Sequence, residues 1–493
     1  MTIIHLPALD AVDRNLVGGK AWSIAHMQRH GIPVPPAFVI GTDVCTRFYA
    51  EGKTLPGELL IELDFAMARL EQRTGKTFGK GPHPLLVSVR SGAATSMPGM
   101  MDTVLNLGMN ADVEAALAQA TGDPAFAADT HRRFIEQFTH VVGHAPPNDP
   151  RAQLHDAVTA VFASWMSERA IRYRASRGLD DNAGTAVTVQ AMVFGNIDAR
   201  SGTGVLFSRD PNTGERKPYG EWLTCGQGEE VVSGRRTPEP LSSLATLLPD
   251  VHAQLLAMSE KLEQLGQDVQ DIEFTVEAGH LWLLQTRAAK RTPQAAIRLA
   301  VSLCEEGLIS REQALQRITP AQLAAARQAV IDPAALRHAR VLAEGKPACP
   351  GVVTGTLVTD VLQAEQRADA GESIILARPT TDPDDVHAMS IVAGVLTELG
   401  GSTSHAAVVS RELGVPCIVG CGAGSLVSLD GVPVTVDATN GKVHAGTLAI
   451  QPPLTSDSPD LSTLQQWARQ CWGLDDGTTL SQALASRPSS QDA

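Results

Sequence analysis

His405 lies in a run of glycine, hydroxyl and small apolar residues that suits phosphoryl chemistry. The run reads GGSTSHAAVV from Gly400 to Val409. An imidazole with an ordinary pKa of about 6.5 is largely neutral at pH 7 and can act as a nucleophile. A phosphoryl group carried on it at the start of a helix would meet backbone N–H groups and the positive end of the helix dipole. A histidine that merely caps the helix or packs is the alternative. The glycine turn, the hydroxyls and the small helix residues favour the nucleophile.

The flanking sequence predicts the elements that place His405. The apolar, β-branched run Ile391–Thr397 predicts a buried strand, which a double glycine ends. A helix capped by Thr403 or Ser404 would then continue until Gly414 stops it, and the following VPCIV predicts the next strand. We therefore expect His405 in the first turn of a helix that follows a glycine-rich loop.

A pair of carboxylates forms the second candidate site. Polar and apolar side chains alternate with period two in residues 270–277 and again in residues 281–287. A short glycine-containing link joins the two segments, so the pattern predicts a β-hairpin. Asp271 and Glu273 then share one strand face, about 7 Å apart at roughly 3.3 Å per residue, and both could address Mg²⁺ on a polyphosphate. The alternative is the solvent-facing polar side of an amphipathic hairpin.

Cationic and polar residues elsewhere could complete such a nucleotide site. Gln285 and Arg287 share a face of the second hairpin arm, and Arg90 ends the apolar run LLVSV. A rigid guanidinium fork suits phosphate oxygens. Lys20 follows a glycine pair, but the segment lacks the spaced glycine and the hydroxyl of a Walker A loop, so this signal is weak alone.

Bulk properties limit the classes of protein. The 493 residues carry a net charge of −14, which argues against a broad nucleic-acid surface. We find no apolar run of membrane-spanning length and no export signal, and the seven cysteines are scattered. We therefore expect a cytoplasmic protein with reduced thiols, without a membrane or nucleic-acid partner.

The chain divides into several predicted regions. Residues 1–292 mix short strands and helices, with a mainly helical insert at about 111–178. Residues 293–340 have helical periodicity and form a predicted connector. Residues 341–448 form the histidine domain, and 449–493 form a partly flexible tail with one predicted helix. The fold class expected from this pattern is multi-domain α/β.

Several blocks together resemble pyruvate phosphate dikinase and the other phosphoenolpyruvate-utilising enzymes. Around the histidine the block is GGSTSHAAVVSRELGVPCIVGCG, with Leu399 where the family usually has arginine. The others are GGKAWSIAHM, VSVRSGAATSMPGMMDTVLNLG, SGTGVLFSRDPNTGE, GEEVVSGRRTPEPL and DIEFTVEAGHLWLLQTRAAKRT. The similarity runs from about residue 15 to about residue 448. It implies an ATP-grasp-type nucleotide-binding domain and a swivelling β/β/α phosphohistidine domain.

The resemblance also implies roles for individual residues. His405 would carry the phosphoryl group, with Arg90 and Arg287 assisting the transfer. ATP would be bound with Mg²⁺, and Asp271 and Glu273 would lie at the metal. The implied nucleotide-binding residues are Lys20, Arg90, Asp271, Glu273, Gln285 and Arg287.

Further implications concern regulation and the co-substrates. Thr403 would be a regulatory phosphorylation position, and either Arg132 or Arg133 would bind inorganic phosphate. The family's (α/β)₈ barrel needs about 250 residues. Only 493 − 448 = 45 residues follow the histidine domain, so we expect the barrel to be absent. The phosphoryl acceptor would then be a separate barrel-type protein or a small molecule. A water-dikinase-like module and a non-catalytic nucleotide sensor remain alternatives.

Overall fold

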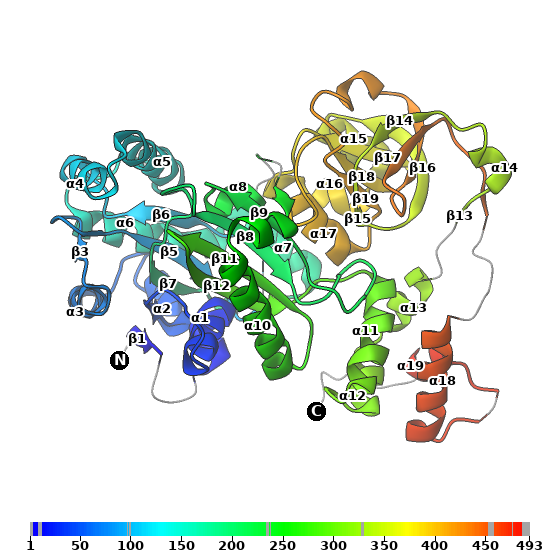
Figure 1. The fold of residues 1–493 in the computed structure, drawn as a ribbon, viewed down its shortest axis with the longest axis horizontal. Helices are drawn as coiled ribbons and strands as arrows, with labels where there is room; N and C mark the ends of the chain where they lie inside the picture. Colours follow the sequence, from blue (N-terminus) through cyan, green and yellow to red (C-terminus); the bar gives the residue numbers. More distant parts are fainter. Residues whose placement is uncertain are drawn as a thin grey trace. The chain divides into compact units, whose positions relative to one another are not determined.

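The computed structural model describes residues 3–7, 12–95, 97, 100–232, 236, 238–326, 330–451, 458–475 and 477–485. The chain divides into two compact units. The first comprises Met1–Thr203, Thr224–Gln227 and Glu273–Thr286, and the second comprises Gly204–Leu223, Gly228–Ile272 and Arg287–Ala493. Both contain helices and strands (Figure 1), which confirms the predicted mixture of helix and sheet.

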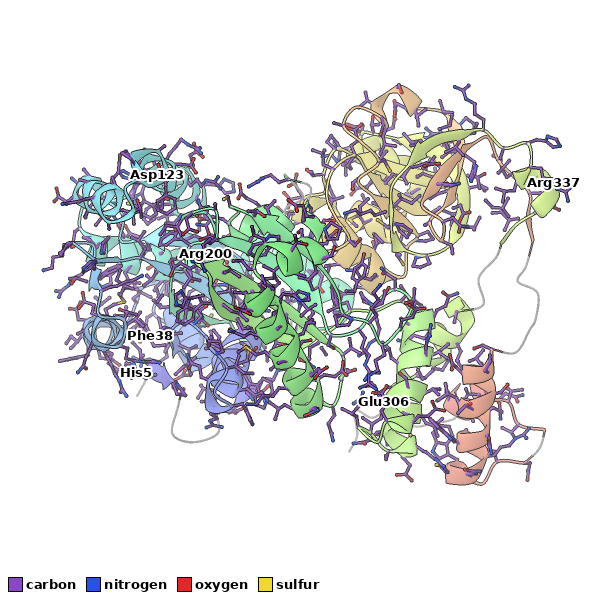
Figure 2. All side chains as sticks on the ribbon, viewed as in Figure 1. His5, Phe38, Asp123, Arg200, Glu306 and Arg337 are labelled. Carbon is purple, nitrogen blue, oxygen red and sulfur yellow. The ribbon has the colours of Figure 1, made fainter. Side chains whose placement is uncertain are left out.

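An antiparallel five-stranded sheet forms the centre of the first unit, in the order β1-β2-β7-β5-β6. Every residue of β2 (Ala37–Ile40) and of β7 (Ala186–Ala191) is buried, including Phe38, which Figure 2 labels. Continuous burial of this kind is typical of strands covered on both faces. The remaining strands are β1 (Ile3–Leu6), β5 (Val87–Gly92) and β6 (Thr103–Leu107).

Helices surround this sheet, and their caps follow from the sequence. Asp123, labelled in Figure 2, accepts the N–H groups of Ala125 and Phe126 and so caps the helix that Pro124 opens. The N-terminal helices and short strands are α1 (Arg14–Arg29), α2 (Thr42–Ala50), α3 (Gly57–Thr74), β3 (Thr77–Phe78) and β4 (Pro84–Leu85). The segment predicted to be helical contains α4 (Ala111–Thr121), α5 (Pro124–Val142), α6 (Pro150–Ala163) and α7 (Glu168–Arg177).

A second five-stranded sheet carries the predicted hairpin, in the order β10-β9-β8-β11-β12. The link between β11 and β12 consists of Ala278 and Gly279, with φ of +48° and +81°. Two positive φ values in a two-residue link are those of a type I′ turn, so the predicted hairpin is confirmed. The strands are β8 (Gly202–Phe207), β9 (Tyr219–Thr224), β10 (Glu239–Pro240), β11 (Gln270–Glu277) and β12 (His280–Ala288). Nearby helices are α8 (Gly228–Val232), α9 (Ser242–Leu247) and α10 (Pro249–Gly266).

The histidine-bearing part of the second unit is an eight-stranded mixed sheet in the order β14-β21-β20-β16-β17-β18-β19-β15. Its strands are β14 (Val341–Glu344), β15 (Lys346–Cys349), β16 (Val352–Val358), β17 (Ile374–Arg378), β18 (Gly394–Thr397), β19 (Cys417–Val419), β20 (Pro433–Asp437) and β21 (Lys442–Ala445). The four strands from β16 to β19 run parallel. Helices α15 (Val361–Asp369), α16 (Val386–Ile391) and α17 (His405–Leu413) contribute Ala364, Met389 and Ala407 to one of its two apolar cores.

The strand before the histidine is shorter than predicted. We expected it over Ile391–Thr397, but Ile391 ends α16 and β18 begins at Gly394. A short apolar run fits a buried helix end as well as a strand, and periodicity alone does not separate the two.

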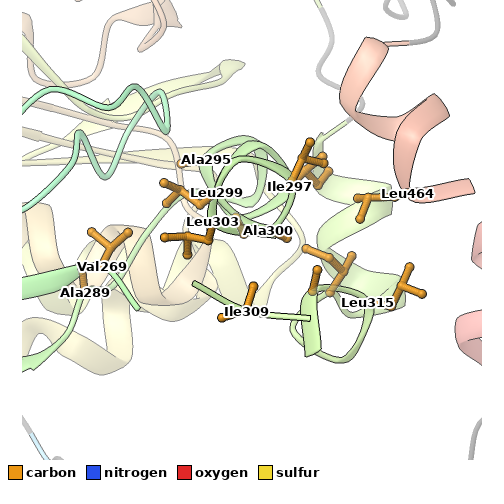
Figure 3. Packing of buried hydrophobic residues seen from close by; sticks show 14 of the residues in the cluster. Val269, Ala289, Ala295, Ile297, Leu299, Ala300, Leu303, Ile309, Leu315 and Leu464 are labelled. Carbon is orange, nitrogen blue, oxygen red and sulfur yellow. The ribbon is translucent and has the colours of Figure 1, made fainter. Parts of the chain in front are cut away.

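Helices on both sides of the histidine domain in the sequence pack together. Helices α11 (Pro293–Glu305), α12 (Arg311–Gln316) and α13 (Pro320–Ala326) precede the domain, and α18 (Pro459–Trp472) and α19 (Leu480–Ala485) follow it. Leu464 of α18 joins Ile297, Leu299 and Leu315 in one cluster (Figure 3). The single tail helix predicted at 461–472 is confirmed as α18, whereas α19 was not predicted.

Two short strands pair where the chain enters and leaves the histidine domain. Strand β13 (Val330–Ile331) is antiparallel to β22 (Ile450–Gln451), with Ile331 opposite Ile450. The short helix α14 (Pro333–Leu336) follows β13. No helix in the described ranges combines the length and apolar composition that crossing a membrane requires.

Candidate active site

Lys20 lies in α1 directly after a glycine pair that packs against the loop following β5. Gly18 has φ of +74°, and a Cβ placed on it would lie 1.9 Å from the carbonyl oxygen of Gly92. The Gly19 N–H donates to the Ala93 carbonyl at 2.9 Å. Only glycine permits this backbone approach. The glycine pair before Lys20 therefore packs directly against Gly92 and Ala93, which follow Arg90 by two and three residues.

Three predicted nucleotide-site residues of the first unit lie together. Arg90 Nη2 donates to Gln285 Oε1 at 3.4 Å and lies 3.7 Å from Glu273 Oε2. The side chains of Arg90 and Glu273 are 18% and 25% exposed, so both remain accessible to a ligand. The structure thus brings together an arginine, a carboxylate and an amide from β5, β11 and β12.

The other two hairpin residues form an ion pair. Arg287 Nε donates to Asp271 Oδ2 at 2.8 Å, and the Asp271 side chain is only 3% exposed. Its Oδ1 is buried and has no hydrogen-bond partner among the described residues. A buried carboxylate oxygen left unpaired is costly, so this atom has unused capacity for a cation or a donor.

The two arginines proposed for inorganic phosphate lie on α5. Arg132 bonds to Glu136 at 2.7 Å and its side chain is 55% exposed. Arg133 Nε donates to Asp129 at 2.6 Å, and its side chain is 28% exposed. Which arginine binds phosphate stays a prediction.

His405 is the first residue of α17, as predicted. Ser404 is the N-cap residue, but its hydroxyl makes no capping hydrogen bond, and Gly414 ends the helix in the left-handed conformation. The imidazole Nε2 is buried without a hydrogen-bond partner among the described residues. Burial lowers the pKa of His405, while the Asp385 and Asp382 carboxylates and a hydrogen bond to the Asp382 backbone act in the opposite direction.

A carboxylate from β9 holds the loop before His405. Glu221 accepts the Ser402 N–H at 3.2 Å, the Thr403 N–H at 3.1 Å and the Thr403 hydroxyl at 2.8 Å. Lys346 Nζ donates to the same carboxylate at 3.1 Å. A Cβ on Gly401 would lie 2.2 Å from Glu221 Oε2, so the second glycine of the pair gives the carboxylate room. Sequence reasoning missed Glu221, because an isolated acidic residue in a strand carries no local signal.

Arg411 supports the same loop from within α17. Its Nη1 donates to the Ser402 carbonyl at 2.9 Å and to the Ala348 carbonyl at 3.2 Å, and the residue is only 3% exposed. Leu399, which stands where the family usually has arginine, donates its N–H to the Pro379 carbonyl and lines the space beside His405. It contributes an apolar wall there.

Two family models match the chain. The model described as pyruvate phosphate dikinase, AMP/ATP-binding domain, matches residues 14–62 and 53–248. The model described as PEP-utilising enzyme, mobile domain, matches residues 370–441, which include His405.

Curated relatives agree with these matches. The chain is 41% identical over 530 residues to the pyruvate, phosphate dikinase of Rhizobium meliloti, covering 93% of this chain and 58% of the relative. The Clostridium symbiosum enzyme is 39% identical, with 92% and 59% covered, and the pyruvate, phosphate dikinase 2 of Zea mays is 39% identical, with 96% and 60% covered. The chain thus spans about three fifths of the length of these relatives. It belongs to the pyruvate phosphate dikinase family, with that family's AMP/ATP-binding domain and the mobile domain of PEP-utilising enzymes.

Proposed function

We propose that this protein is an ATP-dependent phosphotransferase that phosphorylates its own His405. One observation carries the proposal. His405 is the first residue of α17, burial lowers its pKa, and its Nε2 has no hydrogen-bond partner among the described residues, so the ring is neutral and Nε2 is free to act as a nucleophile once it is exposed. A neutral imidazole at a helix N-terminus suits both attack on a phosphorus atom and retention of the phosphoryl group.

The nucleotide would be bound by residues of the hairpin and by two cationic residues from earlier in the chain. Arg90 and Lys20 would contact phosphate oxygens, and Gln285 and Arg287 would complete the site. Asp271 and Glu273 fit Mg²⁺, since Asp271 Oδ1 is buried and unpartnered among the described residues. No group of three or more His, Cys, Asp or Glu side chains in the described ranges could hold a metal ion, so nucleotide oxygens and water would supply the remaining ligands. The bound ion would neutralise charge that develops on the phosphates.

The reaction that we propose proceeds in two balanced steps. Nε2 of His405 attacks the β-phosphorus of ATP and AMP leaves, which places a pyrophosphoryl group on the imidazole. Inorganic phosphate then takes the terminal phosphoryl group as pyrophosphate, and phosphohistidine remains. Arg90 and Arg287 would act as fixed positive charges that stabilise the transferring group.

We further propose that a separate barrel-type protein or a small molecule accepts the phosphoryl group. The test begins with protein phosphorylated by ATP and freed of nucleotide. Pyruvate with magnesium is then added, either alone or with a candidate barrel protein. Loss of label only in the second mixture supports a protein acceptor. Stoichiometric phosphoenolpyruvate from this chain alone would contradict the proposal.

Labelled ATP tests the central step. With β-labelled ATP and Mg²⁺ we expect acid-labile label on His405 and AMP as the nucleotide product, and none with His405→Asn. Dependence on added phosphate separates this reaction from a water-dikinase-like one. Nucleotide binding without label in the parent protein would favour the non-catalytic sensor and overturn the proposal.

A further inference from the structure

The nucleophilic nitrogen of His405 faces into the protein, although the imidazole ring is partly exposed. Nε2 is buried, and the space beside it is lined by Thr381 from the loop after β17, Leu399 from the loop after β18, and Ser404. Thr381 and Ser404 are 6% and 4% exposed. The ring therefore borders a small, half-open compartment formed by three separate stretches of chain.

This compartment is too small for the proposed reaction. It holds about one water-sized sphere. A phosphoryl group has a phosphorus and three oxygens, and its attachment to Nε2 requires room for all four atoms. In-line attack also needs an open approach to the nitrogen. In the arrangement seen here, Nε2 can neither attack ATP nor carry the product.

The polar atoms in the compartment do not lock the ring. Thr381 Oγ1, Ser404 Oγ and His405 Nε2 are all buried and without hydrogen-bond partners among the described residues. Buried polar atoms that lack partners raise the free energy of the state that contains them. Leu399 and Ala406 give the compartment an apolar lining beside the ring. The closed position is thus held by apolar packing and weakened by its unpaired polar atoms.

We propose that Thr381 and Leu399 are positioning residues that set the balance between this closed position of His405 and an open one that exposes Nε2. The neutral ring occupies the closed position. The phosphorylated ring stays open, because the compartment lacks both the volume and the cations for a group of about −2 charge. The statement about the phosphorylated ring rests on the proposed function, whereas the closed position of the neutral ring does not depend on it.

Acylation of histidine by diethyl pyrocarbonate measures this balance without ATP. The modification rate follows the fraction of open protein. In the parent protein His405 should react roughly tenfold more slowly than the exposed His83 and His280, as read by peptide mass spectrometry.

Two variants should change that rate in opposite directions. Thr381→Val keeps the shape but removes an unpaired hydroxyl, so it should slow His405 modification roughly three- to tenfold. Leu399→Ala removes the apolar wall and should accelerate it by a similar factor. Thr381→Ser should restore the parent rate, and His83 and His280 report whether a variant has unfolded.

Opposite shifts at His405 with constant rates at the two reference histidines support the proposal. A parent His405 that reacts as fast as His83, or variants that change the rate in the same direction, would overturn it. Single-turnover labelling by ATP should follow the same order. Absent labelling with the expected acylation pattern would contradict the proposed function alone and leave the two-position histidine standing.

Discussion

The hydroxyl of Thr403 donates to the carboxylate of Glu221 at 2.8 Å, two residues before His405. Both residues are buried, at 2% and 3% exposure. The position that the resemblance marks for regulatory phosphorylation is therefore paired with a fixed negative group. A kinase could reach the Thr403 hydroxyl only after Glu221 has withdrawn, and a phosphate there would then prevent the carboxylate from returning.

Thr403→Asp should mimic that block. Two carboxylates would meet in a buried site, and the new charge would also compete for the N-terminus of α17. We expect His405 labelling to fall by at least roughly tenfold, with ATP affinity unchanged by calorimetry. Thr403→Val removes the hydrogen bond without adding charge and should retain most labelling. Equal labelling in parent and Thr403→Asp would show that the Glu221 contact has no bearing on the reaction.

Glu273→Gln should remove nucleotide-dependent labelling while the fold persists. The side chain is partly exposed, lies 3.7 Å from Arg90, and shares a strand face with Asp271. Loss of a carboxylate that binds magnesium and phosphate should reduce the labelling rate roughly 100-fold or more. Glu215→Gln, an exposed change outside the site, is the matched control. If neither the labelling nor its magnesium dependence changed, this face of the hairpin would be an ordinary solvent-exposed polar surface and not a metal site.

Gly18→Ala should destabilise the first unit, whereas Gly19→Ala should not. A Cβ on Gly18 would lie 1.9 Å from Gly92 O, while one on Gly19 would have its nearest neighbour at 3.6 Å. A residue forced into the left-handed region against backbone costs at least about 1–3 kcal/mol. Urea unfolding measures the difference, and ATP binding should weaken in Gly18→Ala because Lys20 follows the displaced turn. Equal free energies of unfolding for the two variants would contradict the close approach.

Acid should destabilise the histidine domain through His444. This side chain in β21 is 2% exposed, and neither ring nitrogen has a hydrogen-bond partner among the described residues. Burial lowers its pKa, with Lys442 acting in the same direction and Asp437 opposing. The unfolded chain therefore binds the proton more readily, so stability is full above the unfolded pKa of about 6.5 and declines as the pH falls below it.

His444→Gln should flatten that dependence. We would compare the free energy of unfolding at pH 7.5 and pH 5.5 for the parent, His444→Gln and the exposed control His338→Gln. The first variant should lose less stability on acidification than the parent and the control. Some acid sensitivity should remain, because the pKa of His405 is also lowered by burial. An identical pH response in all three proteins would assign the effect to other groups.

Local patterns in the sequence predicted α17 and the β11–β12 hairpin, because caps, glycines and alternation act within a few residues. The cluster of Arg90, Glu273 and Gln285 was proposed through family resemblance, and the structure places these three together. Glu221 and Thr381 were missed. The contact of Glu221 with Thr403 spans 182 positions, and no local pattern records such a distance. The predicted start of β18 was also wrong, because Ile391 fits a helix end and a strand equally well.

The pairing of β13 with β22 places the entrance and the exit of the histidine domain side by side, with Ile331 opposite Ile450. The helices before and after the domain also share one apolar cluster, in which Leu464 packs with residues of α11 and α12. Topologically the domain is an insertion between helices that pack into one bundle. A short turn joining the two strands would excise the domain and leave the bundle's own connectivity intact. The same closeness of the two ends suits the excised domain to independent production or to grafting onto another scaffold.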